Sequence, residues 1–275
     1  MSYAYDNDEF SRYYDTFVAE HVPHDIYWTN TVKQVYTEII QRTFCDNQQK
    51  IIVELGCGTG ENLIYFQEYF QNKDLKFIGI DHSYAMLNRA KEKLINQSNN
   101  QIEYLHGSLT NFANYFETQK IDCILLPAGT FHHLITDNER QEFINNIQRT
   151  LRIETGLFAI YLFPDSLIHI ESVDKSETED KLKLISVENI QQNDNEWLCK
   201  QTFEFNVPPK VEISWQLRTC STFKLINLFI SNNFEILYCC LNGKDLLPYN
   251  ENISYSLMNN STPVIIVFRT IKNTN

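Results

Sequence analysis

The sequence predicts an α/β fold: a seven-stranded, mostly parallel, doubly wound sheet with an antiparallel last strand, an N-terminal helical lid and a small antiparallel β insertion. Three observations predict it. Short apolar runs alternate with helical patterns up to about residue 163, which is typical of a parallel sheet covered on both faces. Glycines at alternate positions follow the first of these runs. Beyond Pro164, polar turns separate strand-like segments, which favours antiparallel pairing.

The elements follow from these patterns in chain order. We expect helices over 9–20 and 25–44, with Pro23 between them. In the alternating part, the pattern predicts strands at 50–55, 75–80, 101–105, 121–126 and 156–163, and helices at 61–71, 83–97, 110–117 and 137–151. After Pro164 we expect strands near 182–187, 197–205 and 211–218, then a helix at 221–231. Strands at 234–241 and 264–269 should close the sheet as an antiparallel pair.

A glycine loop follows the first predicted strand. Glu54 lies near the end of that strand, and Gly56, Gly58 and Gly60 come after it. Glycines let the backbone turn tightly and let a ligand approach the main chain, so this strand, loop and helix predict a nucleotide cradle. A pyrophosphate-binding fingerprint reads G-x-G-x-x-G, whereas the spacing here is G-x-G-x-G and the Glu54 carboxylate would repel pyrophosphate. This disfavours an NAD oxidoreductase, and the acid suits a ligand with an amino group and a positive centre.

The second predicted strand ends in Asp81, whose carboxylate is suited to accept hydrogen bonds from two ribose hydroxyls. Together with the E/D-x-G-x-G-x-G pattern and a following D-x-S-x-x-M-L-x-x-A pattern, it makes residues 45–163 resemble the class I S-adenosylmethionine (SAM) methyltransferases of the small-molecule type. The resemblance implies SAM as the cofactor, bound by Glu54, the three glycines and Asp81. Met86 would lie against the adenine, or belong to an ordinary helix core.

Two further segments are assigned to the cofactor by the resemblance. The family often has an acid after the third strand that contacts the adenine amine, but here Ser108 and Leu109 stand there. Ser108 is still suited to accept a hydrogen bond. Pro127 and Ala128, after the fourth strand, complete the expected cofactor contacts.

The loop after the fourth strand contains His132 and His133 and resembles the N-S-F-x-H-L or L-H-H-L segment of small-molecule methyltransferases. A neutral imidazole takes a proton from an amine or hydroxyl near neutral pH, so both are candidate catalytic residues, with His133 matching the family histidine. The alternative is a pair of histidines that hydrogen-bond the backbone. The loop lacks the D/N-P-P-Y/F of enzymes that methylate nucleic-acid bases and the aspartate that helps hold Mg²⁺ in catechol-type enzymes, so we expect no metal.

The N-terminal segment carries aromatic residues beside acids, like the Y-D…Y-Y-D segments that fold over the active site in related enzymes. Tyr14 is the candidate for contacting SAM or the acceptor, and the alternative is a helix packed on the surface. Trp215 and Arg218 resemble a recurring segment before the last helix. Arg218 is equally suited to pair with a surface acid.

Composition excludes several classes of function. The net charge is −12, and no basic cluster offsets it, which argues against nucleic acid and anionic membrane surfaces as partners. No apolar stretch approaches 18 residues, and the N-terminus lacks the pattern of a signal peptide. Seven cysteines without a C-x-x-C pair fit buried, reduced thiols in a cytoplasmic protein.

We therefore expect one methyltransferase domain. Residues 1–44 form the lid and first helix, 45–163 the SAM-binding core, 165–215 an antiparallel insertion on the substrate side, and 216–275 the closing helix and strands. The expected function is methyl transfer from SAM to nitrogen of a small molecule, such as a secondary metabolite. Two alternatives stay open: oxygen methylation of a small natural product, and a SAM-binding protein without transferase activity. A monomer and a homodimer are both compatible with the sequence.

Overall fold

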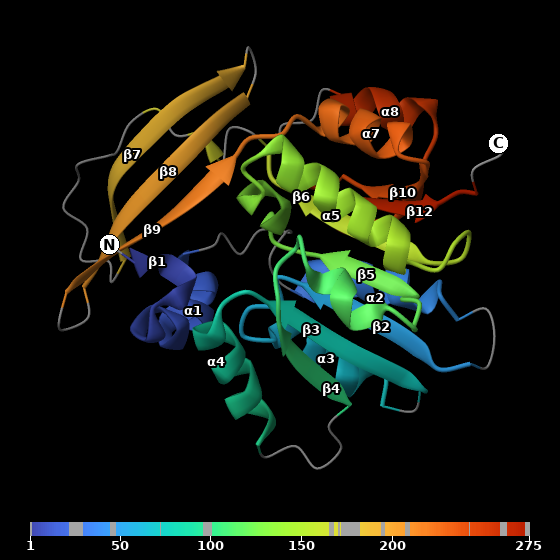
Figure 1. Cartoon of the computed structure of the whole chain (residues 1–275), viewed down its shortest axis with the longest axis horizontal. Helices are drawn as coiled ribbons and strands as arrows, with labels where there is room; N and C mark the ends of the chain where they lie inside the picture. Colours follow the sequence, from blue (N-terminus) through green and yellow to red (C-terminus); the bar gives the residue numbers. More distant parts are fainter. Residues whose placement is uncertain are drawn as a thin grey trace.

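The computed structural model shows a large sheet with helices on both faces and a smaller sheet standing beside it (Figure 1). It describes residues 2–21, 30–44, 48–71, 73–95, 101–164, 168–169, 171, 182–193, 196–206, 210–241, 243–258 and 263–272. The expected helix start at residue 25, Pro23, Cys45 and much of the first half of the insertion lie outside these residues. Within them, no helix is long and apolar enough to cross a membrane.

The large sheet confirms the predicted class. Its order is β11-β10-β12-β6-β5-β2-β3-β4. The strands are β2 (Lys50–Leu55), β3 (Leu75–Asp81), β4 (Ile102–His106), β5 (Cys123–Leu126), β6 (Leu157–Leu162), β10 (Phe234–Cys240), β11 (Leu247–Pro248) and β12 (Val264–Thr270). β2 to β6 pair in parallel, and β12 runs antiparallel to both β6 and β10. The two-residue β11 adds an eighth strand to the seven that were expected.

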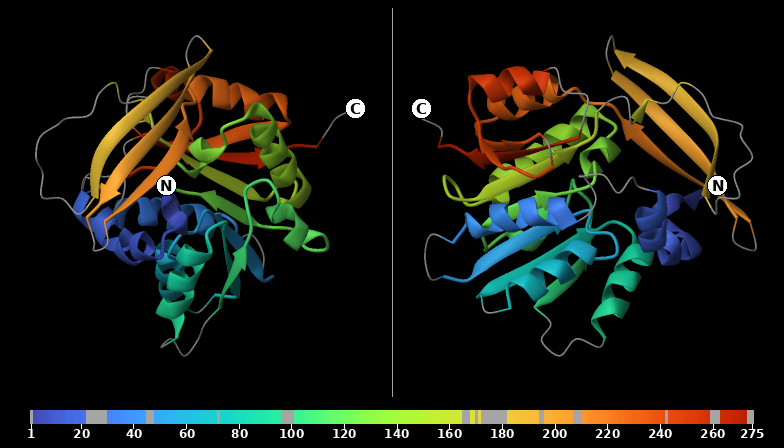
Figure 2. Two further views of the ribbon diagram at one scale, coloured as in Figure 1. Left: turned by 60° about the vertical axis from the view of Figure 1, so that its left-hand side comes forward. Right: turned by 180° about the vertical axis from the view of Figure 1, so that it is seen from behind.

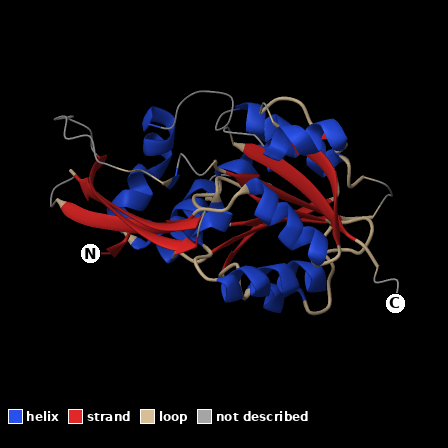
Figure 3. Cartoon of the chain, turned by 90° about the horizontal axis from the view of Figure 1, so that it is seen from above, coloured by secondary structure: helices blue, strands red, loops and turns tan. Residues whose placement is uncertain are grey.

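Two hydrophobic clusters cover the two faces of this sheet, because successive strand side chains point to opposite faces. In β2, Val53 contributes to one cluster and its neighbour Ile52 to the other. The first cluster packs against α5 (Asp137–Thr150), α7 (Thr222–Ser231), α8 (Glu251–Met258) and the 3₁₀ helix η2 (Phe112–Phe116). The second packs against α2 (Asn30–Gln41), α3 (Glu61–Tyr69) and α4 (Tyr84–Leu94). Figure 3 shows helices on both sides of the strands.

The smaller sheet has the order β1-β9-β8-β7. The strands are β1 (Ser2–Tyr3), β7 (Leu182–Asn193), β8 (Glu196–Phe205) and β9 (Val211–Arg218), and all pairs are antiparallel except β1 with β9. The chain then runs through the 3₁₀ helix η1 (Ala4–Asp6) into α1 (Asp8–His21). Figure 2 shows this sheet beside the N-terminal helix, at one end of the strands of the large sheet.

A third hydrophobic cluster holds the N-terminal segment to the small sheet. It combines Phe10 and Tyr13 of α1 with Phe205 of β8, Ile213 of β9 and Met86 of α4, and these side chains are at most 9% exposed together with the rest of the cluster. The segment is therefore packed between the insertion and the main domain, as a lid would be.

One expectation about the elements needs correction, and three elements were not predicted. The segment expected to be helical at 110–117 forms only the short η2, and β1, β11 and α8 were not predicted. Two-residue strands carry no periodicity that a sequence pattern can detect, and β1 exists only because β9, some 210 residues later, offers it a free edge.

Candidate functional site

The glycine loop lies at the carboxyl ends of the parallel strands, where open α/β sheets bind ligands. β2 ends at Leu55, and α3 begins at Glu61 after Gly60, which is left-handed with φ +77°. Gly56 N–H and Cys57 N–H donate to the carbonyl oxygen of Ile80, at 2.7 and 3.1 Å. The loop is thereby fastened to the end of β3.

The three glycines have different surroundings. A Cβ at Gly60 would lie 2.0 Å from Tyr104 Oη, and one at Gly56 would lie 2.5 Å from Thr130 Cγ2, so both permit close packing inside the protein. A Cβ at Gly58 would have Tyr14 Cε1 as its nearest described neighbour, at 3.9 Å, which is an ordinary van der Waals distance. The main chain at Gly58 is therefore less crowded than at Gly56 and Gly60 and lies in contact with the lid.

Asp81 ends β3 beside this loop and is 7% exposed. Its Oδ2 accepts a hydrogen bond from Gly58 N–H at 2.9 Å, and its Oδ1 accepts one from Ser83 N–H at 2.8 Å. Burial raises the pKa of this carboxyl, and the two backbone donors oppose that shift. Each oxygen keeps lone pairs for further donors, so the carboxylate is held in a fixed orientation next to the loop.

Glu54 is 1% exposed, and only one of its oxygens is satisfied. Oε1 accepts from Asn62 Nδ2 at 2.6 Å, whereas Oε2 has no hydrogen-bond partner in the described part of the chain. Burial raises the pKa of Glu54 to about 8, against the lowering effect of Asn62 and Lys33. A buried acceptor without a donor is costly unless a ligand supplies one.

The turn after β5 is strained. Thr130 N–H donates to the carbonyl of Pro127 at 3.0 Å, and between them Ala128 and Gly129 have φ of +55° and +68°. A left-handed alanine costs free energy that the surroundings must offset, and such residues cluster at functional sites. The turn leads directly into η3 (Thr130–His133), which carries both candidate histidines.

His132 is fully buried, and both its ring nitrogens have backbone partners. Nδ1 lies 3.0 Å from the carbonyl oxygen of Arg218, and Nε2 accepts from Phe163 N–H at 3.2 Å. Burial lowers the pKa of His132 to about 3. This neutral ring connects η3 to β9 and to the end of β6, an arrangement that favours the backbone-binding alternative over catalysis.

His133 is only half-buried and faces the lid. Its Nδ1 lies 3.1 Å from Tyr3 Oη and 3.2 Å from the carbonyl oxygen of Gln216. Nε2 has no hydrogen-bond partner among the described residues. Burial, with a smaller contribution from His82, lowers the pKa of His133 to about 4.

The lid covers the glycine loop with aromatic rings. Tyr14 lies over Gly58 and meets Tyr5 edge-on, with ring centroids 6.0 Å apart. Tyr5 in turn stacks on Trp215 of β9, at 6.0 Å and 16° between planes. Ser83 Oγ donates to the carbonyl of Tyr5 at 2.6 Å, so the lid is fastened to the start of α4. The described residues 2–21 of the expected lid lie against the glycine loop and the start of α4, and their role as a lid stays a prediction.

Comparisons with known proteins agree on the domain. Residues 52–154 match a family described as "Methyltransferase domain". A SAM-dependent methyltransferase from Clostridium acetobutylicum aligns with a TM-score of 0.69 at 13% identity, over 96% of this chain and 99% of that one. Residues 52–154 thus match a methyltransferase domain, and the chain has the fold of solved SAM-dependent methyltransferases. SAM is the cofactor of this domain, and SAM-bound structures stand among its structural neighbours.

Other solved methyltransferases share the fold. The CcbJ methyltransferase from Streptomyces caelestis has a TM-score of 0.66 at 12% identity, over 98% of this chain and 99% of that one. The sugar N-methyltransferase KedS8 from Streptoalloteichus has a TM-score of 0.61 at 13% identity, over 94% and 93%. At these identities the likeness shows the fold.

Curated relatives match over shorter stretches. A tRNA (guanine-N(7)-)-methyltransferase from Streptococcus agalactiae is 31% identical over 80 residues, which is 29% of this chain and 37% of that protein. A carboxy-S-adenosyl-L-methionine synthase from Desulfotalea psychrophila is 25% identical over 122 residues, or 44% and 46%. The chain therefore spans less than half of these relatives.

The residues of this methyltransferase domain fit SAM. The unsatisfied Oε2 of Glu54 is suited to the amino group of the methionine end, and the fixed carboxylate of Asp81 is suited to the ribose hydroxyls. Gly58 is the least crowded of the three loop glycines, which suits the approach of a ligand to the main chain between them. Burial raises the pKa of both carboxyls, and a bound ammonium or sulfonium would favour their charged forms.

The remaining predicted cofactor residues have differing roles. Met86, 1% exposed, belongs to the cluster that holds the lid, so its packing accounts for its burial. Ser108 N–H donates to Asn111 Oδ1, and its Oγ lies 3.0 Å from Thr110 Oγ1. Leu109 packs against the first cluster of the sheet. Their contact with SAM stays a prediction.

Sequence reasoning missed two contributors and identified only part of the partners of a third. Tyr3 and the carbonyl of Gln216 meet at His133, but nothing local in the sequence connects them. Arg218 pairs with both a surface acid and a buried one. Its guanidinium lies 2.8 Å from the exposed Asp137 and 2.6 Å from the buried Glu196. It thus belongs to a network at the junction of β9 with α5.

Two other features lie away from the site. No group of three or more His, Cys, Asp or Glu side chains in the described ranges is arranged to hold a metal ion.

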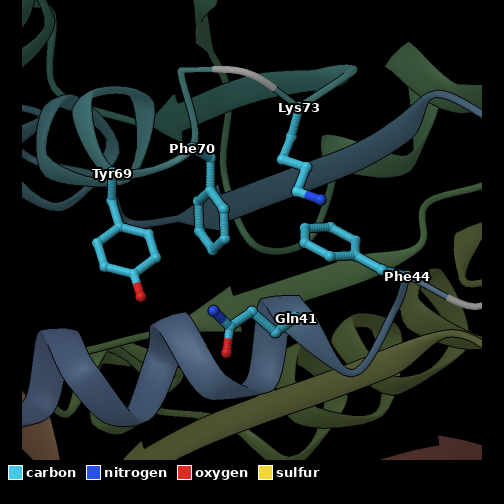
Figure 4. A pocket seen from close by; sticks show the side chains of 5 residues that line it. All are labelled: Gln41, Phe44, Tyr69, Phe70 and Lys73. Atoms are coloured by element: carbon cyan, nitrogen blue, oxygen red, sulfur yellow. The ribbon is translucent and has the colours of Figure 1, made fainter.

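A cavity of about 400 Å³ is lined by Gln41, Phe44, Tyr69, Phe70 and Lys73. Figure 4 shows the Lys73 ammonium near the Phe44 ring, 5.5 Å from its centroid. This cavity precedes β3, at the end of the sheet opposite the glycine loop, and contains none of the candidate residues.

Proposed function

We propose that this protein transfers the methyl group of SAM to an amine nitrogen of a small molecule, with His133 as the group that accepts the proton. The observation that carries the proposal is the half-buried imidazole of His133. Its Nδ1 is engaged by the protein, and its Nε2 has no partner among the described residues. When bound, SAM supplies an activated methyl group, so the chain's own task is to position the acceptor, exclude water and manage one proton.

The basicity of His133 favours nitrogen over oxygen. Its pKa of about 4 makes it a weak base. A hydroxyl with a pKa near that of water, ~15.7, would need a far stronger base to become a nucleophile. A neutral amine attacks without prior deprotonation. With SAM bound, the amine would take its methyl group, and the surplus proton on nitrogen would leave to solvent by way of His133 Nε2, which holds it only in passing because its pKa is about 4.

Charge and surroundings suit a cationic or polar acceptor. Asp81 and Glu54 are buried beside the site, and the whole chain has a net charge of −12. The aromatic rings of Tyr5, Tyr14 and Trp215 lie together beside the glycine loop, and such rings would suit the apolar faces of a ring-shaped molecule. Structural neighbours include the sugar N-methyltransferase KedS8 and the glycopeptide N-methyltransferase MtfA. We therefore propose amino sugars, free or attached to a larger natural product, as the first acceptors to test.

The proposal is tested with a panel of amino sugars and their hydroxyl counterparts, with labelled SAM and mass spectrometry of the products. We expect N-methyl products only, without added metal and in the presence of EDTA. Preferential labelling of the hydroxyl counterparts would favour an O-methyltransferase. Tight SAM binding without transfer to any acceptor would favour a SAM-binding protein without transferase activity.

A further inference from the structure

The extreme N-terminus brings a tyrosine hydroxyl to the candidate base. β1 pairs in parallel with β9, with Tyr3 opposite Ser214. Tyr3 Oη lies 3.1 Å from His133 Nδ1, and the carbonyl oxygen of Gln216, two residues farther along β9, lies 3.2 Å from the same nitrogen. Two protein oxygens therefore converge on one ring nitrogen.

The chemistry of the two oxygens decides which nitrogen carries the proton. A carbonyl only accepts hydrogen bonds, so a lone pair on Nδ1 would face the Gln216 oxygen at 3.2 Å without attraction. A hydrogen on Nδ1 is attracted to both oxygens, because a tyrosine hydroxyl also accepts. The neutral ring is therefore protonated on Nδ1, and the lone pair is on Nε2.

The neighbouring histidine follows the same rule. His132 Nδ1 lies 3.0 Å from the carbonyl of Arg218, and its Nε2 accepts from a backbone N–H, so its proton must be on Nδ1. Carbonyls two residues apart on a strand point to the same side. β9 thus presents the carbonyls of Gln216 and Arg218 to the two histidines, but only His133 also has a hydroxyl at this nitrogen.

We propose that Tyr3 is a positioning residue for catalysis: its hydroxyl accepts from His133 Nδ1–H, holds the ring with Nε2 toward the acceptor, and stabilises the imidazolium that forms when Nε2 takes the proton. This inference rests on the proposed function. The Tyr3 ring is itself held by His82, at 5.2 Å between centroids, and by Tyr5 at 5.6 Å. His82 is the titratable group facing His133 from the loop after β3, and Tyr3 and Tyr5 face it from the lid.

The test uses the full chain with Tyr3→Phe, which keeps the ring contacts and removes only the hydroxyl. A hydrogen bond to a charged group contributes roughly 1.5–3 kcal/mol, so we expect kcat to fall about tenfold to a hundredfold. The dissociation constant for SAM and the melting temperature should be unchanged. Tyr84→Phe is the matched control, because this α4 tyrosine is 65% exposed and stacks on His106 instead. If Tyr3 served packing alone, the phenylalanine ring would fulfil that role. Wild-type kcat in Tyr3→Phe therefore overturns the proposal.

A second measurement does not depend on turnover. Long-range ¹⁵N–¹H NMR of histidine-labelled protein should show His133 protonated on Nδ1 at neutral pH, and in Tyr3→Phe the Nδ1 hydrogen should exchange with water at least about tenfold faster. A proton on Nε2, or unchanged exchange, refutes the role of Tyr3 even if no amine is methylated. SAM binding and the acceptor panel judge the proposed function separately.

Discussion

At the scale of single residues, the site depends on a few polar atoms whose partners are fixed by the backbone. Asp81 receives N–H donors from Gly58 and Ser83, and Glu54 receives one from Asn62 and keeps a second oxygen unsatisfied. Such pre-oriented acceptors bind a ligand without first having to be ordered. Two predictions follow from these carboxylates.

Asp81→Ala should weaken SAM binding about tenfold to a hundredfold, because it removes hydrogen bonds that involve a charged acceptor. Titration calorimetry measures the change. Asp74→Ala is the matched control: this carboxylate lies just before the other end of the same strand and, among the described residues, accepts a side-chain hydrogen bond from the exposed Gln49. Equal SAM affinity in the Asp81 variant and wild type would place the ribose elsewhere.

Glu54 should release a proton when SAM binds. Its pKa of about 8 leaves the carboxyl mostly protonated at pH 7, and a bound ammonium group favours the carboxylate. Calorimetry at pH 7 in buffers of different ionisation enthalpy should therefore show close to one proton released per SAM. The release should vanish above about pH 9, where Glu54 is already ionised, and in Glu54→Gln. Proton uptake at pH 7 would contradict the assignment.

At the scale of elements, the sequence predicted those segments whose structure depends on neighbouring residues in the chain. The strand at 50–55 was predicted with the bounds that β2 has, and the glycine loop and Asp81 fell where the sequence placed them. The site around His133 could not be predicted in the same way. Tyr3 and Gln216 lie 130 and 83 residues away from it along the chain, and only the pairing of β1 with β9 brings them together. The ion-pair network of Arg218 attaches the small sheet to α5 of the main domain. The third hydrophobic cluster attaches the lid to the small sheet.

Arg218→Met should destabilise the protein by roughly 3–5 kcal/mol, because it leaves Glu196 buried with less compensation. Both side chains are at most 7% exposed, and Glu196 keeps only Asn193, Lys224 and the more distant Arg140. Urea unfolding measures the change. The double variant Arg218→Met with Glu196→Gln should regain much of the loss. A single variant as stable as wild type would mean that the network contributes little.

A chain that begins at Asp25 should lose most turnover yet unfold cooperatively. The two clusters on the faces of the large sheet contain no residue of α1, whereas the third cluster depends on Phe10 and Tyr13. Removing the lid therefore opens the site to water and exposes Phe205 and Met86. Calorimetric melting, turnover and binding of a hydrophobic dye test this together. Full turnover by the shortened chain would show that the segment serves packing alone.

At the scale of the whole molecule, the arrangement is a cofactor domain with a cap made from two distant parts of the chain. Residues 2–21 and the sheet of β7, β8 and β9 close over the same end of the large sheet (Figures 1 and 2). A cap of this kind can vary while the core fold stays the same, because function depends on the site and not on the fold alone.

The net charge of the whole molecule predicts that it does not bind tRNA. In this respect it should differ from the tRNA methyltransferases that it partly matches. Binding to nucleic acid depends on Lys and Arg that neutralise phosphates and release counterions. Here 23 Lys and Arg face 35 Asp and Glu, and many of the described cations are already paired: Arg218 with Glu196, Lys93 with Asp15, Lys200 with Glu188. Bulk tRNA at low salt should therefore neither bind in a gel-shift assay nor accept label from SAM, whereas a tRNA (guanine-N(7)-)-methyltransferase run in parallel should do both. Binding that weakens steeply as salt is raised would show a phosphate-contacting surface and would favour an RNA substrate over an amino sugar.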